Sequence, residues 1–175
     1  MRISSGLELN FKLIVISLAL ILVSINCYAI REECEIDKGY SLPEDTRVEL
    51  FECYHHGFVE GLVVVEQGEV FGKNNKYGFA NKQGDIIVPL EFDNASSFSE
   101  GFAKVEKQNK FSFINTKGEP LVPIEYDSAR SFSDGFAVVE KAGNYGFLNT
   151  RGEIIIPLIY DTAWDFRQGL ALVGL

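Results

Sequence analysis

The sequence predicts an all-β protein built from tandem three-stranded antiparallel meander repeats. Three observations support this fold class: a period of 34 residues, turn residues at fixed places in each period, and short runs of β-branched and aromatic residues between the turns. Apolar residues make up 46% of the 175-residue chain and aromatic residues 13%, which is enough for a packed core. We expect the units to stack as a solenoid-like array or as a partial propeller-like arc.

The repeat period is seen first in the glycines that open successive units, Gly101, Gly135 and Gly169. Landmarks of several other residue types keep the same spacing in three copies. They are Asn81, Asn115 and Asn149; Gly84, Gly118 and Gly152; Pro89, Pro123 and Pro157; Asp93, Asp127 and Asp161; Ala95, Ala129 and Ala163; and Phe98, Phe132 and Phe166. Chance would not keep so many landmarks in step, so 58–175 is predicted to be a repeat array. Its units span about 61–100, 101–134 and 135–168, followed by a terminal strand in 169–175.

Each unit is expected to contain three strands, which in the third unit are 136–140, 145–149 and 153–157. An Asn-x-x-Gly turn joins the second strand to the third, because Asn bonds its own backbone and Gly tolerates a positive φ. Proline is expected to end the third strand, since it has no N–H to donate. The terminal strand, Leu170–Val173, is expected to complete or cap the last sheet.

The linker that follows each third strand carries the recurring Asp, Ala and Phe. We expect the Phe and the Ala to pack between neighbouring units. The Asp is predicted to form a turn or a backbone cap. Calcium binding is the alternative, but each unit offers one Asp without the dense run of oxygen ligands that this ion needs.

The recurring pattern Tyr-Gly-Phe-x-Asn-x-x-Gly-x-x-x-x-Pro-x-x-[Tyr/Phe]-Asp-x-Ala-x-x-Phe-x-x-Gly resembles the WG repeat, also called the KWG repeat. The Trp-Gly of that family corresponds to Tyr77-Gly78 and Tyr145-Gly146, and to Phe111-Ser112 in the middle unit. Ser112 therefore puts close backbone packing in the middle unit in question. The resemblance implies an all-β array that is used for interaction, and it implies no particular reaction.

The first 29 residues are typical of a signal peptide. Basic residues flank a polar start, an apolar run extends over 13–25, and small residues favour cleavage after Ala29. The protein is therefore predicted to be exported, to the periplasm or the extracellular space. Two alternatives stay open, an uncleaved membrane anchor and a lipid on Cys27.

Residues 30–57 are predicted to form a mostly irregular cap that is held by a Cys34–Cys53 disulfide. Two free thiols are the alternative. A zinc site that adds His55 and His56 would need a spacing that matches no common zinc motif. Accordingly, the sequence predicts no metal and no cofactor.

No catalytic motif occurs in the sequence, so we expect a protein without enzymatic activity. The net charge of −9 argues against nucleic-acid binding. The favoured hypothesis is an interaction module that binds a protein or a component of the cell envelope. A carbohydrate- or peptidoglycan-binding module is the first alternative, with Tyr126, Tyr160 and Trp164 as exposed ligand contacts. An enzyme with a site near His55 and His56 is the second.

Overall fold

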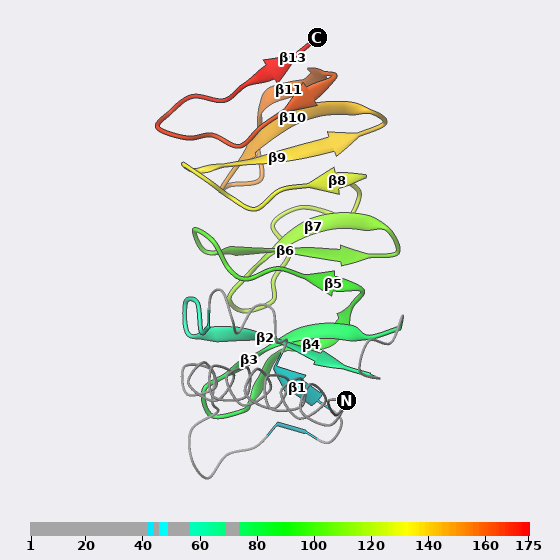
Figure 1. Cartoon of the computed structure of the whole chain (residues 1–175), viewed down its shortest axis with the longest axis vertical. Helices are drawn as coiled ribbons and strands as arrows, with labels where there is room; N and C mark the ends of the chain where they lie inside the picture. Colours follow the sequence, from blue (N-terminus) through cyan, green and yellow to red (C-terminus); the bar gives the residue numbers. More distant parts are fainter. Residues whose placement is uncertain (1–41, 44–45, 49–56, 69–73) are drawn as a thin grey trace, which may run out of the picture.

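The computed structural model describes residues 42–43, 46–48, 57–68 and 74–175, and its regular elements are all strands (Figure 1). The small antiparallel sheets lie one above another along the longest axis of the molecule. This arrangement is the solenoid-like form of the predicted all-β array, because the last strand lies at the opposite end of the stack from the first. Within the described ranges, no helix is long and apolar enough to cross a membrane.

The first sheet contains the three predicted strands and one strand from the segment before the array. Its order is β1-β2-β3-β4, and all pairs are antiparallel. The strands are β1 (Thr46–Val48), β2 (Leu62–Gln67), β3 (Lys76–Asn81) and β4 (Ile86–Phe92). β1 pairs along the edge of β2, so the predicted cap contributes an edge strand to the array.

The third unit repeats the same meander, and the second unit repeats its first two strands. They contain β6 (Phe102–Lys107), β7 (Lys110–Asn115), β9 (Phe136–Lys141), β10 (Asn144–Asn149) and β11 (Ile154–Tyr160). The order in the third unit is β11-β10-β9-β8. Backbone N–H groups at the ends of the Asn-x-x-Gly turns donate back to the Asn carbonyls, as between Gly118 and Asn115 at 2.8 Å. These turns are therefore the tight hairpins that the sequence predicts.

Each linker contains a two-residue strand that the sequence did not predict, and this strand pairs with a strand that follows it in the chain. These strands are β5 (Asn94–Ala95), β8 (Ser128–Ala129) and β12 (Thr162–Ala163). β5 pairs with β6 and β8 with β9, whereas β12 pairs with β13 (Val173–Gly174). The terminal strand that was predicted over Leu170–Val173 is observed only at Val173–Gly174, and it does not complete the sheet of the third unit. It forms a further two-stranded layer at the C-terminal end of the stack.

The prediction that proline ends the third strand is wrong for the outer units. β4 runs through Pro89 and β11 runs through Pro157. The ladder shifts register beside these prolines, since Tyr77 pairs with Phe92 but Phe79 pairs with Val88. Proline lies in the resulting bulge, where the ladder needs no N–H, so the strand can continue.

Glycine in the second strand permits a close approach of the third strand. A Cβ atom on Gly78 would lie 2.5 Å from the carbonyl oxygen of Val88. In the middle unit, Ser112 is fully buried, and its hydroxyl donates to the carbonyl of Val122 at 2.6 Å. There, residues 120–126 make isolated bridges in place of a continuous strand. The exchange of glycine for serine thus accompanies the irregular third strand of this unit.

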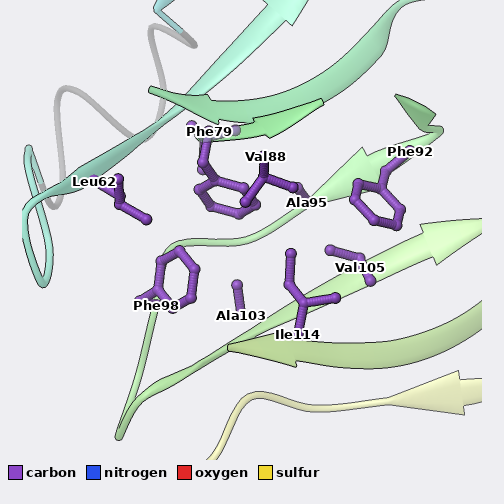
Figure 2. Close-up of a cluster of buried hydrophobic side chains, with 10 residues drawn as sticks. Leu62, Phe79, Val88, Phe92, Ala95, Phe98, Ala103, Val105 and Ile114 are labelled. Atoms are coloured by element: carbon purple, nitrogen blue, oxygen red, sulfur yellow. The ribbon is translucent and has the colours of Figure 1, made fainter. Parts of the chain in front are cut away.

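The core lies between successive sheets, with the linker phenylalanine inserted as a wedge (Figure 2). At the first interface, Phe98 packs against Phe79 with 4.8 Å between ring centroids. The equivalent rings repeat this contact, because Phe132 lies 5.0 Å from Phe113 and Phe166 lies 5.0 Å from Phe147. The linker alanines are buried in the same interfaces. The predicted packing role of the linker Phe and Ala is therefore confirmed.

Candidate binding surface

The recurring aspartates cap hairpins in the next unit. Asp93 accepts the backbone N–H of Gln108 at 2.6 Å, and Asp127 accepts that of Ala142 at 2.8 Å. The other carboxylate oxygens pair with Lys76 in the first case and with Lys110 in the second. These lysines, followed by the backbone donors, hold the pKa of both carboxyls below the usual value.

The recurring aspartates also make a backbone hydrogen bond. The N–H of Asp161 donates to the carbonyl of Gly174 at 2.9 Å. The equivalent bonds of Asp93 and Asp127 go to Glu106 and Glu140, both at 2.8 Å. Across the described part of the chain, no three His, Cys, Asp or Glu side chains gather to hold a metal ion. The recurring aspartates therefore fit the structural role of a backbone cap.

A second series of carboxylates links the units, and sequence reasoning missed it. Glu60 accepts the backbone N–H of Gly101 at 2.9 Å, and Glu100 accepts that of Gly135 at 2.8 Å. Asp134 repeats the bond to Gly169 at 3.0 Å. The signal in the sequence is the acidic residue that precedes each unit-opening glycine. Its partner is the glycine of the next unit, which the local pattern could not reveal.

The Asn-x-x-Gly turns combine a local bond network with a close contact to the preceding unit. Asn115 accepts the N–H groups of Lys117 and Glu119, each at 3.0 Å, and Asn149 repeats both bonds. Asn81 makes the second of them, to Asp85 at 2.9 Å. All three turn glycines have a positive φ, as predicted.

The same glycines face the third strand of the unit before them. A Cβ atom on Gly118 would lie 3.3 Å from the side chain of Val88, and one on Gly152 would lie 3.0 Å from that of Val122. Gly84 belongs to the first unit, and its φ is +83°. The turn therefore needs glycine for its backbone angle, and the second and third units also need it for close stacking.

Of the three aromatic residues predicted as exposed ligand contacts, the structure contradicts Tyr126. Its ring is buried, with 5% of its surface exposed, and it packs in the core between the second and third units. Burial, followed by the charge of Glu125, raises the pKa of its hydroxyl. Tyr160 is partly buried, and Trp164 is 46% exposed. The three aromatic residues therefore do not form one exposed row.

The third strands of the outer units, and the segment that replaces the third strand in the middle unit, expose apolar residues. We name this set the third-strand stripe; it comprises Ile87, Pro89, Pro123, Ile124, Ile155 and Pro157. Neighbouring parts of the stripe are close together, since each second hairpin turn packs on the third strand of the preceding unit. Proline at its centre also blocks edge-to-edge pairing with other sheets, because it offers no N–H. The prolines of the stripe recur with the repeat period, and Ile87 and Ile155 are two periods apart, whereas the middle unit has the partly buried Leu121 at the equivalent position and exposes Ile124 instead.

Ion pairs border the stripe at the first two interfaces. Lys107 binds Glu91 at 2.6 Å, and Lys141 binds Glu125 at 2.7 Å. The residues one period later are Ile159 and Leu175, and both are exposed. The stripe is therefore bordered by charge along the first two units and by apolar side chains at the third.

Several predictions fall outside the described residues. The signal peptide over 1–29, the Cys34–Cys53 disulfide and the pair His55 and His56 all lie there. They remain predictions.

Comparison with known proteins gives one family. A family model for the WG containing repeat matches residues 77–111, 111–145 and 145–175, which together make up more than half of the chain. No curated protein and no solved structure matches the chain. The three consecutive matches agree with the period of the sheets, the buried linker aromatics and the glycine-to-strand contacts described above. The chain belongs to the family of proteins that contain the WG repeat.

Proposed function

We propose that this protein is a non-enzymatic interaction module that binds a protein or a component of the cell envelope through the third-strand stripe. One observation carries the proposal: each unit exposes a proline at the same place of the repeat, with an exposed isoleucine close to it in the sequence. The other repeated side chains take part in the fold itself, as caps, turn residues or core wedges. Exposed apolar surface of this kind is typical of sites where proteins bind one another.

Capture from cell-envelope fractions tests the proposal. The bait is the full chain, compared with a variant that carries Ile87→Lys and Ile155→Lys in the stripe. A matched control variant carries Asn74→Lys and Thr150→Lys, which add the same two charges at exposed turn positions. We expect wild type and control to recover the same component and the stripe variant to lose it. Equal recovery by all three, or none above background by wild type, would contradict the proposal.

The exposed ring of Trp164 favours carbohydrate binding as a second candidate. One exposed ring supports carbohydrate binding less than the three predicted exposed contacts would have done. Arg130 occupies the equivalent position one period earlier, so Trp164→Arg places a residue there that the repeat accommodates. If wild type is retained on purified cell-wall material and the Trp164→Arg variant is not, carbohydrate binding is favoured. Our proposal places the contact on the stripe and therefore expects Trp164→Arg to be retained no less than wild type.

We also propose that the protein acts outside the cytoplasm, on the basis of the signal-peptide pattern in residues 1–29. The intact mass of the mature protein, measured with and without a reductant, tests this. It distinguishes cleavage after Ala29 from retention of the segment and from a lipid on Cys27, and it reports the Cys34–Cys53 disulfide. A full-length mass from a cytoplasmic fraction would contradict the proposed location.

A further inference from the structure

An acidic residue stands directly before the third-strand stripe in every unit. Asp85, Glu119 and Glu153 each follow the glycine of an Asn-x-x-Gly turn, so they lie one period apart, and all three are exposed. We name these three residues the acidic border. Exposed side chains alternate with more buried ones from Asp85 to Pro89, so Asp85 lies on the same face as Ile87 and Pro89. The acidic border therefore runs along one side of the stripe.

The packing of the turns also brings the acidic border close to the stripe of the preceding unit. A Cβ atom on Gly118, the chain neighbour of Glu119, would lie 3.3 Å from the side chain of Val88, which stands between two stripe residues. Gly152, the neighbour of Glu153, packs in the same way on the middle unit. The carboxylates and the apolar side chains therefore form one continuous surface that extends over successive layers of the stack.

The charge of the acidic border is only partly balanced by the protein itself. Each of the three turns contains one cation, yet among the described residues only Arg151 pairs with the border, with Glu153 at 2.6 Å. Asp85 and Glu119 each accept a hydrogen bond from the neutral side chain of the asparagine that opens the turn, at 3.0 Å and 2.7 Å. The net charge of the whole chain is −9. This electrostatic environment attracts a cationic partner to the stripe.

The spacing of the layers indicates which backbone conformation fits this surface. Equivalent residues recur once per layer, and packed sheets lie about 10 Å apart. A polyproline II segment rises about 3.1 Å per residue with three residues per turn, so every third side chain points the same way at intervals of about 9 Å. A β-strand does not match, because side chains three residues apart point to opposite faces. A polyproline II segment that lies along the stack can thus place one residue on the acidic border in each layer.

Such a segment also suits the prolines of the stripe. Polyproline II has no internal hydrogen bonds, and it can be recognised through its side chains. Pro89, Pro123 and Pro157 offer no N–H for a backbone ladder, which disfavours the addition of a partner strand at this edge. The stripe therefore favours recognition through apolar and charged side chains over pairing with the backbone of a partner.

We propose that the partner of the third-strand stripe is a protein segment in the polyproline II conformation that carries a basic residue at every third position. Its basic side chains pair with the acidic border, and its apolar side chains pack on the prolines and isoleucines of the stripe. This inference rests on the proposed function, because it names the partner of the same surface.

Fluorescence anisotropy with labelled peptides tests the inference on the full chain. The probe consists of four repeats of Lys-Pro-Leu. One comparison peptide repeats Glu-Pro-Leu, and another has the composition of the probe with its lysines placed side by side. We expect the periodic lysine probe to bind more tightly than either comparison peptide, and its affinity to fall as salt screens the exposed charges. Equal binding of the periodic and the clustered lysine peptides, or no binding of either, would overturn the inference.

Two double variants locate the contact. Asp85→Asn with Glu119→Gln removes two charges from the acidic border and keeps side chains of similar shape. The control is Glu106→Gln with Glu140→Gln, which removes two charges from first strands, at the end away from the Asn-x-x-Gly turns. We expect the border variant to bind the lysine probe about three- to tenfold more weakly than wild type, and the control variant to bind it as wild type does. Equal affinities of all three chains would contradict the proposed contact.

A charge reversal distinguishes a lost contact from a damaged fold. A chain with Asp85→Lys and Glu119→Lys should bind the Glu-Pro-Leu peptide in preference to the lysine probe, because the sign of the border is then inverted. A misfolded chain would not show this exchange of preference. If the reversed chain kept the circular dichroism spectrum of wild type but bound neither peptide, the acidic border would not be the contact and the inference would fail.

Capture from cell-envelope fractions separates this inference from the proposed function. We expect the border variant to lose the component that wild type recovers, as the stripe variant does. If the border variant kept that component while the stripe variant lost it, the proposed function would stand and a basic partner would be refuted. Failure of wild type to recover any component would contradict the proposed function, whereas the peptide measurements decide the chemistry of recognition.

Discussion

At the scale of single residues, the absence of a Cβ atom sets how closely the second and third strands approach in the outer units. We expect Gly146→Ala to lower the free energy of unfolding by about 1–3 kcal/mol, because the added methyl meets backbone atoms that cannot rotate away. The new Cβ would lie 2.6 Å from the carbonyl oxygen of Ile156. Urea denaturation measures the change, with Thr150→Ala as an exposed control expected to stay within about 0.5 kcal/mol of wild type. Similar midpoints for both variants would show that the strands can separate without cost.

The carboxylate of Asp127 makes the stability of the array depend on pH. The ammonium of Lys110 and then the N–H of Ala142 hold its pKa in the folded protein below the value of about 3.9 found in unfolded chains. A lowered folded pKa stabilises the fold above the unfolded pKa, and this stabilisation is lost as the pH falls through the folded value.

Asp127→Asn tests this dependence, because it removes the charge and keeps an acceptor of similar shape. We expect the variant to be less stable than wild type at pH 7, and the difference to shrink as the pH falls below about 4. Urea midpoints measured across this range provide the test. The ion pair of Asp93 with Lys76 is present in both wild type and the variant, so the difference between them reports the contribution of Asp127 alone. A difference that stays constant with pH would contradict the electrostatic explanation.

At the scale of elements, the hairpin between β9 and β10 carries a local strain that can be removed. Ala142 and Gly143 form its turn with φ values of +53° and +80°, which suit glycine or asparagine better than alanine. We expect Ala142→Gly to raise the free energy of unfolding by about 0.5–1 kcal/mol. The substitution keeps the backbone N–H of residue 142, which donates to the carboxylate of Asp127.

Thermal and urea denaturation check this expectation. The opposite change, Ala142→Val, should destabilise the protein, because a β-branched residue strongly disfavours a positive φ. If both substitutions lowered stability, the side chain of Ala142 would have a role that its backbone angle does not explain.

The hairpins were predictable from the sequence because their turn residues act locally. Asn115 and Gly118 bond each other across four residues, so the pattern alone indicates the turn. β5 and β8 were missed because a two-residue strand is too short to show alternation, and its partner lies in the following unit. The continuation of β4 through Pro89 was missed for a similar reason. A bulge is a property of the pair of strands, and the sequence of one strand does not reveal it.

The candidate site shows the same limit. The apolar third strands were visible in the sequence, but which side of each is exposed depends on neighbouring units. Tyr126 was expected on the surface, yet its bridge to Phe111 brings its ring into the core. The glycines whose N–H groups donate to the earlier carboxylates were recognised only as landmarks. Their bonds connect residues about one period apart, where a sequence pattern carries no information on contact.

At the scale of the whole molecule, the contacts between layers join neighbours along the stack. Ser99 donates to the carbonyl of Phe132 at 2.9 Å, and Ser133 donates to that of Phe166 at 2.8 Å. The bonds between a carboxylate and a unit-opening glycine also join one layer to the next. Stability in such an array is close to a sum of unit terms and nearest-neighbour terms. The effect of losing one wedge should therefore depend on its place in the stack.

Two equivalent wedges allow this dependence to be measured. Phe132 is 3% exposed and joins the second unit to the third, whereas Phe166 is partly buried and joins the third unit to the C-terminal layer. We expect Phe132→Ala to cost about 3–5 kcal/mol and to speed amide exchange on both sides of its interface. Phe166→Ala should cost less and should speed exchange mainly in β12 and β13, because only one small layer depends on that wedge. Hydrogen exchange resolved by mass spectrometry distinguishes the two patterns. Equal, uniform loss of protection in both variants would mean that the array unfolds as a single unit and that nearest-neighbour additivity fails.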